Sequence, residues 1–186
     1  GESGKYDEAR KFYTEAISVA KATGDRLAEN YLYLFVAQTT EKLLPAQQKN
    51  FELEKRIQSF VQIAQRFHEC NHPTGEAFAY LQAGKLYESQ EKLAEAREMY
   101  QRAVELEDER TSEFADYEFH RPYQIELGIE GDREQWYAML AEILIRLKRP
   151  EEALRYLDKA RLKTYFDALV ETPVEIRNVG LKKDME

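Results

Sequence analysis

Two runs of small and aromatic residues between Tyr80 and Val104 limit what this chain can fold into. Within each run the residues recur at intervals of three or four positions, which predicts two amphipathic helices. The runs consist of Tyr80, Ala83, Gly84 and Tyr87, followed by Leu93, Ala96, Tyr100, Ala103 and Val104. Small residues let two antiparallel helices approach closely, and aromatic residues fill the space beside them. We therefore predict a closely packed helix-turn-helix unit.

The same pattern recurs elsewhere in the chain. The second run alone is repeated near the start, at Tyr6, Ala9, Tyr13, Ala16 and Ile17. Both runs are repeated near the other end, at Tyr137, Leu140, Ala141, Leu144, Pro150, Ala153, Leu157 and Ala160. A looser copy lies between them, at Tyr33, Val36, Ala37, Ile57, Phe60, Val61 and Ala64. The chain is therefore predicted to contain several helix-turn-helix units.

These spacings resemble those of the tetratricopeptide repeat family. A unit of this kind cannot bury its apolar face alone, so units stack on one another. The resemblance implies an all-α, right-handed superhelical solenoid of about three and a half repeats. The expected divisions of the chain are a half repeat at 4–23, repeats at 26–72, 75–107 and 133–171, an inserted segment at 108–131 and a tail at 173–186.

Helix-breaking and capping residues predict about seven long helices and no strands. Gly24 ends one helix, and Asp25 can cap the next by accepting hydrogen bonds from its first amides. Pro45 is expected to close the helix that begins near Arg26, and Pro173 to end the last one. Further boundaries are expected at Pro73-Thr74-Gly75, at a capping box of Asp132 with Gln135, and at Pro150.

Composition and charge exclude several classes of function. The net charge of −8 argues against nucleic-acid binding, which needs clustered Lys and Arg. A single cysteine rules out an internal disulfide framework and favours a cytoplasmic location. No run of 18 apolar residues and no signal peptide is present, so no membrane contact is expected within this chain. Because the pattern begins inside a repeat, the chain is expected to be a piece of a longer protein, which leaves an upstream targeting segment open.

No arrangement of residues points to catalysis or to a cofactor. His68, Glu69, Cys70 and His72 are possible metal ligands by type, but their spacing on a helix would scatter them around its axis. We predict no metal site here, and instead a frayed helix end with a half-buried cysteine and two ordinary histidines. Glycine-rich phosphate loops and nucleophile motifs are also missing from the sequence. The chain is therefore predicted not to be an enzyme.

The resemblance implies that the first helix of each repeat lines a concave groove that binds a protein or peptide. The groove residues predicted in this way are Gln38, Lys42, Gln82, Lys85, Ser89, Glu142 and Arg146. The carboxylate-binding Lys, Asn and Arg of chaperone-binding family members are replaced here by Leu34, Gln38, Gln82, Gln135 and Met139. Lys85 and Arg146 could still contact an acidic group of a ligand. We therefore predict an interaction scaffold that binds a peptide or helix of a partner protein.

Three alternatives stay open at this point. The acidic and aromatic inserted segment at 108–131 is either an elaborated linker or a contact element at the edge of the groove. Residues 160–169 resemble the segment that follows the repeats in bacterial proteins with a caspase-like CHAT protease domain, which would make this chain the repeat region of a larger regulated protease. The apolar half repeat at the start could also mediate assembly of a homo-oligomer.

Overall fold

The computed structural model describes residues 2–43, 52–112 and 133–171, with side chains over 8–40, 52–109 and 135–162. These residues form seven helices and no strand, which confirms the all-α prediction. The helices are α1 (Glu2–Thr23), α2 (Arg26–Leu43), α4 (Leu53–Glu69), α5 (Pro73–Ser89), α6 (Leu93–Ser112), α8 (Arg133–Arg146) and α9 (Pro150–Glu171). Pro45, Asp132 and Pro173 lie outside the described residues, as does most of the inserted segment. The first residues of that segment continue α6, which extends to Ser112.

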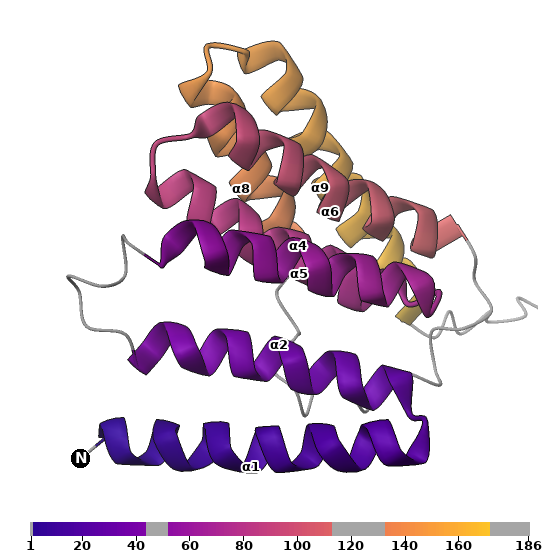
Figure 1. The fold of residues 1–186 in the computed structure, drawn as a ribbon. Helices are drawn as coiled ribbons and strands as arrows, with labels where there is room; N and C mark the ends of the chain where they lie inside the picture. Colours follow the sequence, from indigo (N-terminus) through magenta and orange to yellow (C-terminus); the bar gives the residue numbers. More distant parts are fainter. Residues whose placement is uncertain (1, 44–51, 113–132, 172–186) are drawn as a thin grey trace, which may run out of the picture.

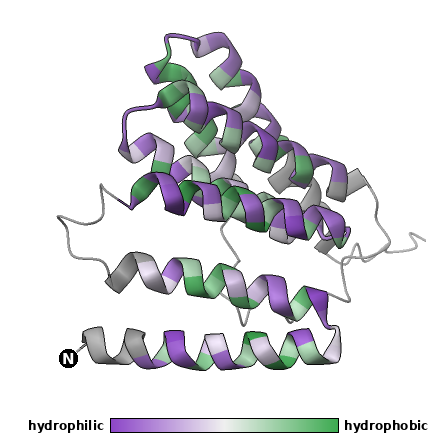
Figure 2. Ribbon diagram, in the orientation of Figure 1, coloured by the Kyte–Doolittle hydropathy of each residue, from purple (hydrophilic) through white to green (hydrophobic). Residues whose placement is uncertain are grey.

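The helices stack in chain order to form a solenoid. Close contacts join α1 to α2, α4 to α5, α5 to α6 and α8 to α9, and further contacts of α2 with α4 and of α6 with α8 join these groups. Figure 1 shows the stack from α1, at the bottom of the view, to α8 and α9 at the top. Hydrophobic and hydrophilic residues alternate along the outer helices in Figure 2, as expected for helices that are buried on one side.

Helix α5 lies at the centre of the stack and forms the closest helix crossing that the repeat pattern predicts. Gly84 is buried, and a Cβ atom added to it would lie 2.5 Å from the ring of Tyr100 on α6. Gly75, in the first turn of α5, has the same relation to the ring of Phe67 on α4. Both aromatic rings are fully buried. Helix α5 is thus held between two aromatic side chains at points where it carries glycine.

Four turns between helices share one backbone geometry. Each contains a residue in the left-handed conformation, namely Gly24, Asn71, Glu91 or Lys148, with φ between 54° and 75°. The amide of the following residue donates to the carbonyl five positions earlier, as in Asp25 to Ala20 and Arg149 to Leu144. Asp25 also caps α2, because its Oδ1 accepts from the Ala28 amide at 2.9 Å. The predicted end of α1 and start of α2 are confirmed.

Replacing Lys148 with glycine is expected to stabilise the protein by about 1 kcal/mol. An L-amino acid in the left-handed region is strained by roughly 1–2 kcal/mol, whereas glycine adopts this region freely. Gly24→Ala is the matched control and should destabilise by a similar amount, since no atom lies within 4 Å of the added Cβ and only the backbone angle matters. Urea unfolding of the three proteins measures both changes. If both variants unfold like the parent protein, backbone strain in these turns is unimportant.

Candidate interaction surface

Helix α5 exposes very few of its side chains to solvent. Only Lys85 and Ser89 are exposed, and its remaining residues are buried or half-buried. Both belong to the groove set predicted from sequence, and Gln82 of the same set is half-buried one turn earlier. Within the described residues Lys85 forms no ion pair, whereas the Ser89 hydroxyl donates to the Leu86 carbonyl at 2.7 Å. The open side of α5 is therefore a short polar strip.

The other predicted groove residues lie on α2 and α8. Glu142 is exposed on α8, and Gln38 is half-buried on α2. Lys42 lies in the last turn of α2, but its side chain is outside the described part of the chain. These helices hold the positions that the family resemblance assigns to a concave surface. That they act together as a binding groove stays a prediction.

Arg146, the last member of the predicted set, is engaged in an ion-pair network. Its guanidinium lies 3.0 Å from Oε1 of Glu88 and 2.6 Å from Oε2 of Glu91, which joins the end of α8 to the end of α5 and the turn after it. Arg146 and Glu88 are each about 30% exposed, at 30% and 28%, so solvent screens this contact only partly. The link between two repeats through Arg146 could not be predicted from sequence, because its partners are distant along the chain.

Glu88 also accepts a hydrogen bond from the hydroxyl of the buried Tyr100. The Tyr100 Oη donates to Oε2 of Glu88 at 2.7 Å, while the ring of Tyr100 packs against Gly84. Burial and this hydrogen bond to a carboxylate both raise the pKa of Tyr100. Glu88 therefore connects three helices, because it accepts from Tyr100 on α6 and from Arg146 on α8.

The segment considered for metal ligation has a structural role instead. His72 is buried and caps α5, since its Nδ1 accepts from the Gly75 amide at 3.1 Å. Because Nδ1 accepts, the neutral ring carries its proton on Nε2, which can donate to the Tyr31 hydroxyl 3.3 Å away. His68 contacts Glu76 at 3.1 Å, and the Cys70 sulfur accepts from Asn30 at 3.4 Å. His72 is thus not the ordinary histidine of a frayed helix end that we expected.

The burial of Tyr31, which lies next to this cap, leads us to expect a loss of stability at alkaline pH. Burial raises the pKa of Tyr31 to about 12, from about 10 in an unfolded chain. The folded state favours the neutral hydroxyl, so Tyr31 does not reduce stability below pH 10 but increasingly does so as the pH rises toward 12. At pH 11 the free energy of unfolding is lowered by about 1.4 kcal/mol. Urea unfolding at pH 9 and pH 11 should show a smaller fall for Tyr31→Phe than for the parent protein. Equal falls would mean that Tyr31 ionises normally in the folded state.

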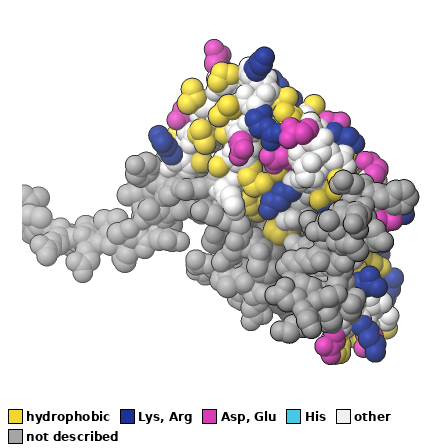
Figure 3. Space-filling model, turned by 90° about the vertical axis from the view of Figure 1, so that its left-hand side faces the viewer, with side chains coloured by type: hydrophobic (Ala, Val, Ile, Leu, Met, Phe, Trp, Pro, Cys, Tyr) yellow, Lys and Arg dark blue, Asp and Glu magenta, His cyan; other side chains and the backbone are white. Residues whose placement is uncertain are grey.

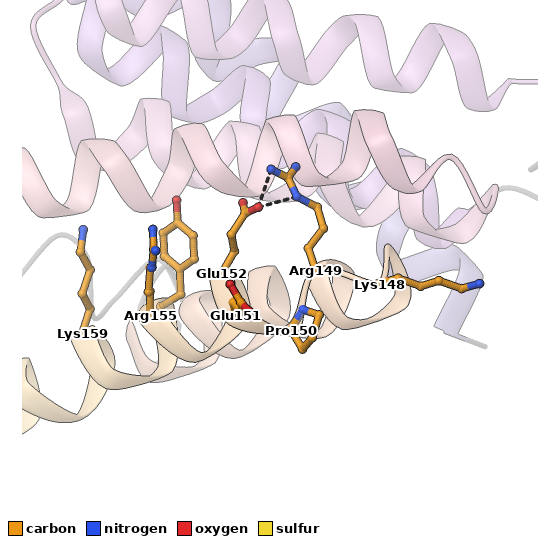
Figure 4. A pocket seen from close by; sticks show the side chains of 8 residues that line it. Lys148, Arg149, Pro150, Glu151, Glu152, Arg155 and Lys159 are labelled. Atoms are coloured by element: carbon orange, nitrogen blue, oxygen red, sulfur yellow. Dashed lines mark hydrogen bonds and ion pairs between the residues drawn. The ribbon is translucent and has the colours of Figure 1, made fainter.

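A hollow of about 560 Å³ lies along the first turns of α9. Figure 4 shows most of its side chains projecting from α9 in the same direction, with Lys148 turned away. Arg149 pairs with Glu152 at 2.5 Å, and Lys159 lies 3.3 Å from Asp108 of α6. The lining combines basic and acidic groups that partly neutralise one another. It lacks the apolar walls that are usual in a small-molecule site.

The described residues offer no centre for metal binding and no helix for membrane insertion. Within them, no three His, Cys, Asp or Glu side chains come together as metal ligands. None of the described helices is both long and apolar enough to cross a membrane. The absence of a catalytic site stays a prediction from the sequence.

Comparison with known families bears on the repeats directly. A family model described as tetratricopeptide repeat matches residues 1–23, 79–110 and 135–160. The chain carries tetratricopeptide repeats. The matched stretches cover α1, α5 from residue 79 onward with most of α6, and most of α8 with the first half of α9, so the family model matches the repeat stretches recognised in the sequence near both ends. Tetratricopeptide repeats generally act as non-catalytic scaffolds for protein interaction.

Two solved structures were found to be similar, and one of them supports this fold. BtubC (BKLC) from P. vanneervenii is similar over 98% of this chain, with 19% sequence identity and a TM-score of 0.59. The present chain spans 65% of the BtubC chain, and at this identity the likeness concerns the fold alone. MamA protein matches over 89% of this chain and 97% of its own, with 15% identity and a TM-score of 0.36, too low to indicate a shared arrangement. No curated protein is similar enough in sequence to count as a relative.

Proposed function

We propose that this protein is a non-catalytic scaffold whose tetratricopeptide repeats bind a peptide or helix of a partner protein along α2, α5 and α8. The proposed contacts are Gln38, Lys42, Gln82, Lys85, Ser89, Glu142 and Arg146. One observation supports this assignment above the others. The two side chains that α5 exposes, Lys85 and Ser89, are both among the predicted contacts, and the fold does not use them for packing.

The charges on this surface influence which ligand groups it favours. Lys85 is exposed and can contact an acidic group directly. Arg146 is held by Glu88 and Glu91, so a ligand carboxylate would compete with two carboxylates that are already bound. Glu142 adds an exposed negative charge on the neighbouring helix α8. We therefore assign acidic ligand groups to Lys85 and basic ones to Glu142.

Charge reversal at these two positions tests the proposal. Lys85→Glu combined with Glu142→Lys leaves the net charge unchanged and should weaken partner binding. The melting temperature should stay nearly the same, because exposed charges contribute only about 0–1 kcal/mol each. Proteins captured from a lysate of the source organism by the parent protein and by the variant, quantified by mass spectrometry, measure the difference.

Two matched variants decide where binding occurs. Glu95→Lys reverses an exposed charge on α6, which is the second helix of its repeat and lies outside the proposed surface. This variant should capture the same partners as the parent protein. Shortening the inserted segment between Thr111 and Tyr123 tests the alternative contact element. If the charge-reversed variant retains every specific partner while the shortened chain loses them, the inserted segment is the interaction site and the assignment to α2, α5 and α8 is wrong.

A further inference from the structure

Two large apolar side chains lie exposed on one face of α1. Phe12 is 60% exposed and Val19 is 62% exposed. They are seven residues apart, so they lie two turns from each other on the same side of the helix, in a row with Glu8 and Glu15. Ile17 and Ala20 on another side of α1 are buried. Helix α1 is therefore apolar on two sides, and only one of them is covered.

Helix α6 has the same sequence pattern as α1, and there the corresponding face is covered. Glu8-Ala9-Arg10 and Phe12-Tyr13 of α1 correspond to Glu95-Ala96-Arg97 and Met99-Tyr100 of α6. In this alignment Phe12 takes the place of Met99, which is 8% exposed, and Val19 takes the place of the half-buried Leu106. The same positions are thus buried in one repeat and open to solvent in another.

The helix that covers α6 is α5, and its contacts show what α1 requires. A Cβ atom on Gly84 would lie 3.3 Å from Cβ of Met99 and 2.5 Å from the ring of Tyr100. A helix that packs in this manner needs a very small residue at the crossing. Helix α8, which packs on α9, has the buried Ala141 at the equivalent position. A helix covering α1 would have to carry glycine or alanine where it crosses Tyr13.

The charges beside this face differ between the two helices. Arg102 of α6 lies 5.5 Å from the centre of the Tyr80 ring on α5 and 3.4 Å from its hydroxyl. The corresponding residue of α1 is Glu15, which is exposed, as is Glu8 two turns earlier in the row. An acidic residue in this place favours a basic side chain on the covering helix rather than a tyrosine. The two carboxylates thus add charge complementarity to the requirement for shape.

We propose that the face of α1 formed by Phe12, Glu15 and Val19 binds one amphipathic helix of a partner protein. The bound helix has the pattern of the first helix of a repeat. It presents an apolar row, carries glycine or alanine at the crossing with Tyr13, and places Lys or Arg opposite Glu15. It packs on α1 as α5 packs on α6. This surface is separate from the side chains assigned above to α2, α5 and α8.

A synthetic peptide tests this inference on the full chain. The probe has the sequence of residues 73–92 with Tyr80→Lys, so that the lysine faces Glu15. Hydrogen exchange of the protein, followed by mass spectrometry with and without the peptide, should show slower exchange in α1. Phe12→Glu combined with Val19→Glu should weaken peptide binding about tenfold or more, because the apolar contact is lost. Both residues are exposed, so the variant is expected to fold.

Matched controls make each outcome decisive. Leu154→Glu combined with Leu162→Glu changes two leucines of α9 that are equally exposed, at 60% and 59%, and should leave binding unchanged. Figure 3 shows hydrophobic side chains among charged ones on the upper part of the molecule, where α8 and α9 lie. A peptide that also carries Gly84→Leu should bind at least about tenfold more weakly. Absence of protection in α1, or equal binding of the two peptides, overturns the inference. Self-association of the protein alone that Phe12→Glu abolishes would identify a second copy as the occupant instead.

Discussion

Gly84→Leu is expected to lower the free energy of unfolding by roughly 3 kcal/mol or more. The first atom of the new side chain would lie 2.5 Å from the Tyr100 ring, which is fully buried and has no free space to enter. Overpacking of a core usually costs about 1–3 kcal/mol, and here the clash involves a rigid ring between two helices. Urea unfolding monitored by circular dichroism measures the change.

Lys85→Leu is the matched control for this substitution. It places the same side chain one position further along α5, where the parent residue is exposed. We expect a change within about 0.5 kcal/mol. Ala141→Leu should be destabilising, because Ala141 is buried at the equivalent crossing of the last repeat. If Gly84→Leu and Ala141→Leu both unfold like the parent protein, the assigned repeat register is wrong.

Glu88→Ala is expected to destabilise the protein by about 2 kcal/mol. The substitution removes the acceptor of the buried Tyr100 hydroxyl and one of the two carboxylates that hold Arg146. A buried hydroxyl that loses its partner costs about 1–3 kcal/mol. The double mutant Glu88→Ala with Tyr100→Phe should therefore lose less than the sum of the two single variants, which a double-mutant cycle measures.

Glu91→Ala separates the exposed part of this network from the buried part. Glu91 also pairs with Arg146, but its side chain is 77% exposed, so its loss should cost no more than about 1 kcal/mol. Equal losses in Glu88→Ala and Glu91→Ala would show that the ion pairs matter and that the Tyr100 hydrogen bond does not.

The periodic parts of this fold could be predicted from sequence because local rules determine them. The small and aromatic residues around Gly84 and Ala141 mark helix crossings, and Gly24 with Asp25 marks the end of one helix and the start of the next. These features depend on residues only a few positions apart. The prediction was less sharp near Pro73, where a boundary was expected through Gly75. The helix already begins at Pro73, so Gly75 lies inside its first turn. Glycine is needed at this position because the Phe67 ring occupies the space where a Cβ atom would lie.

The side-chain network could not have been predicted in the same way. Glu88 and Arg146 are far apart in the chain, and nothing in their local sequence distinguishes them from solvated charges. The His72 cap was also missed, since histidine is not among the residues that usually cap helices. Pro73 at the first helical position was the available sign that a helix begins there. Contacts of this kind depend on how the repeats stack, which periodicity alone does not determine.

The near-complete burial of α5 has a consequence for how this surface can evolve. Substitutions at its buried positions disturb the fold, so new binding preferences on this helix can arise mainly at Lys85 and Ser89. Among natural variants of this sequence, these two positions should diverge freely, whereas Gly75 and Gly84 should remain glycine. Helix α8 exposes Gln135, Ala138, Glu142 and Ile145 and therefore has more positions that selection can change. Adaptation to a different partner is thus expected to leave a denser record of substitutions on α8 than on α5.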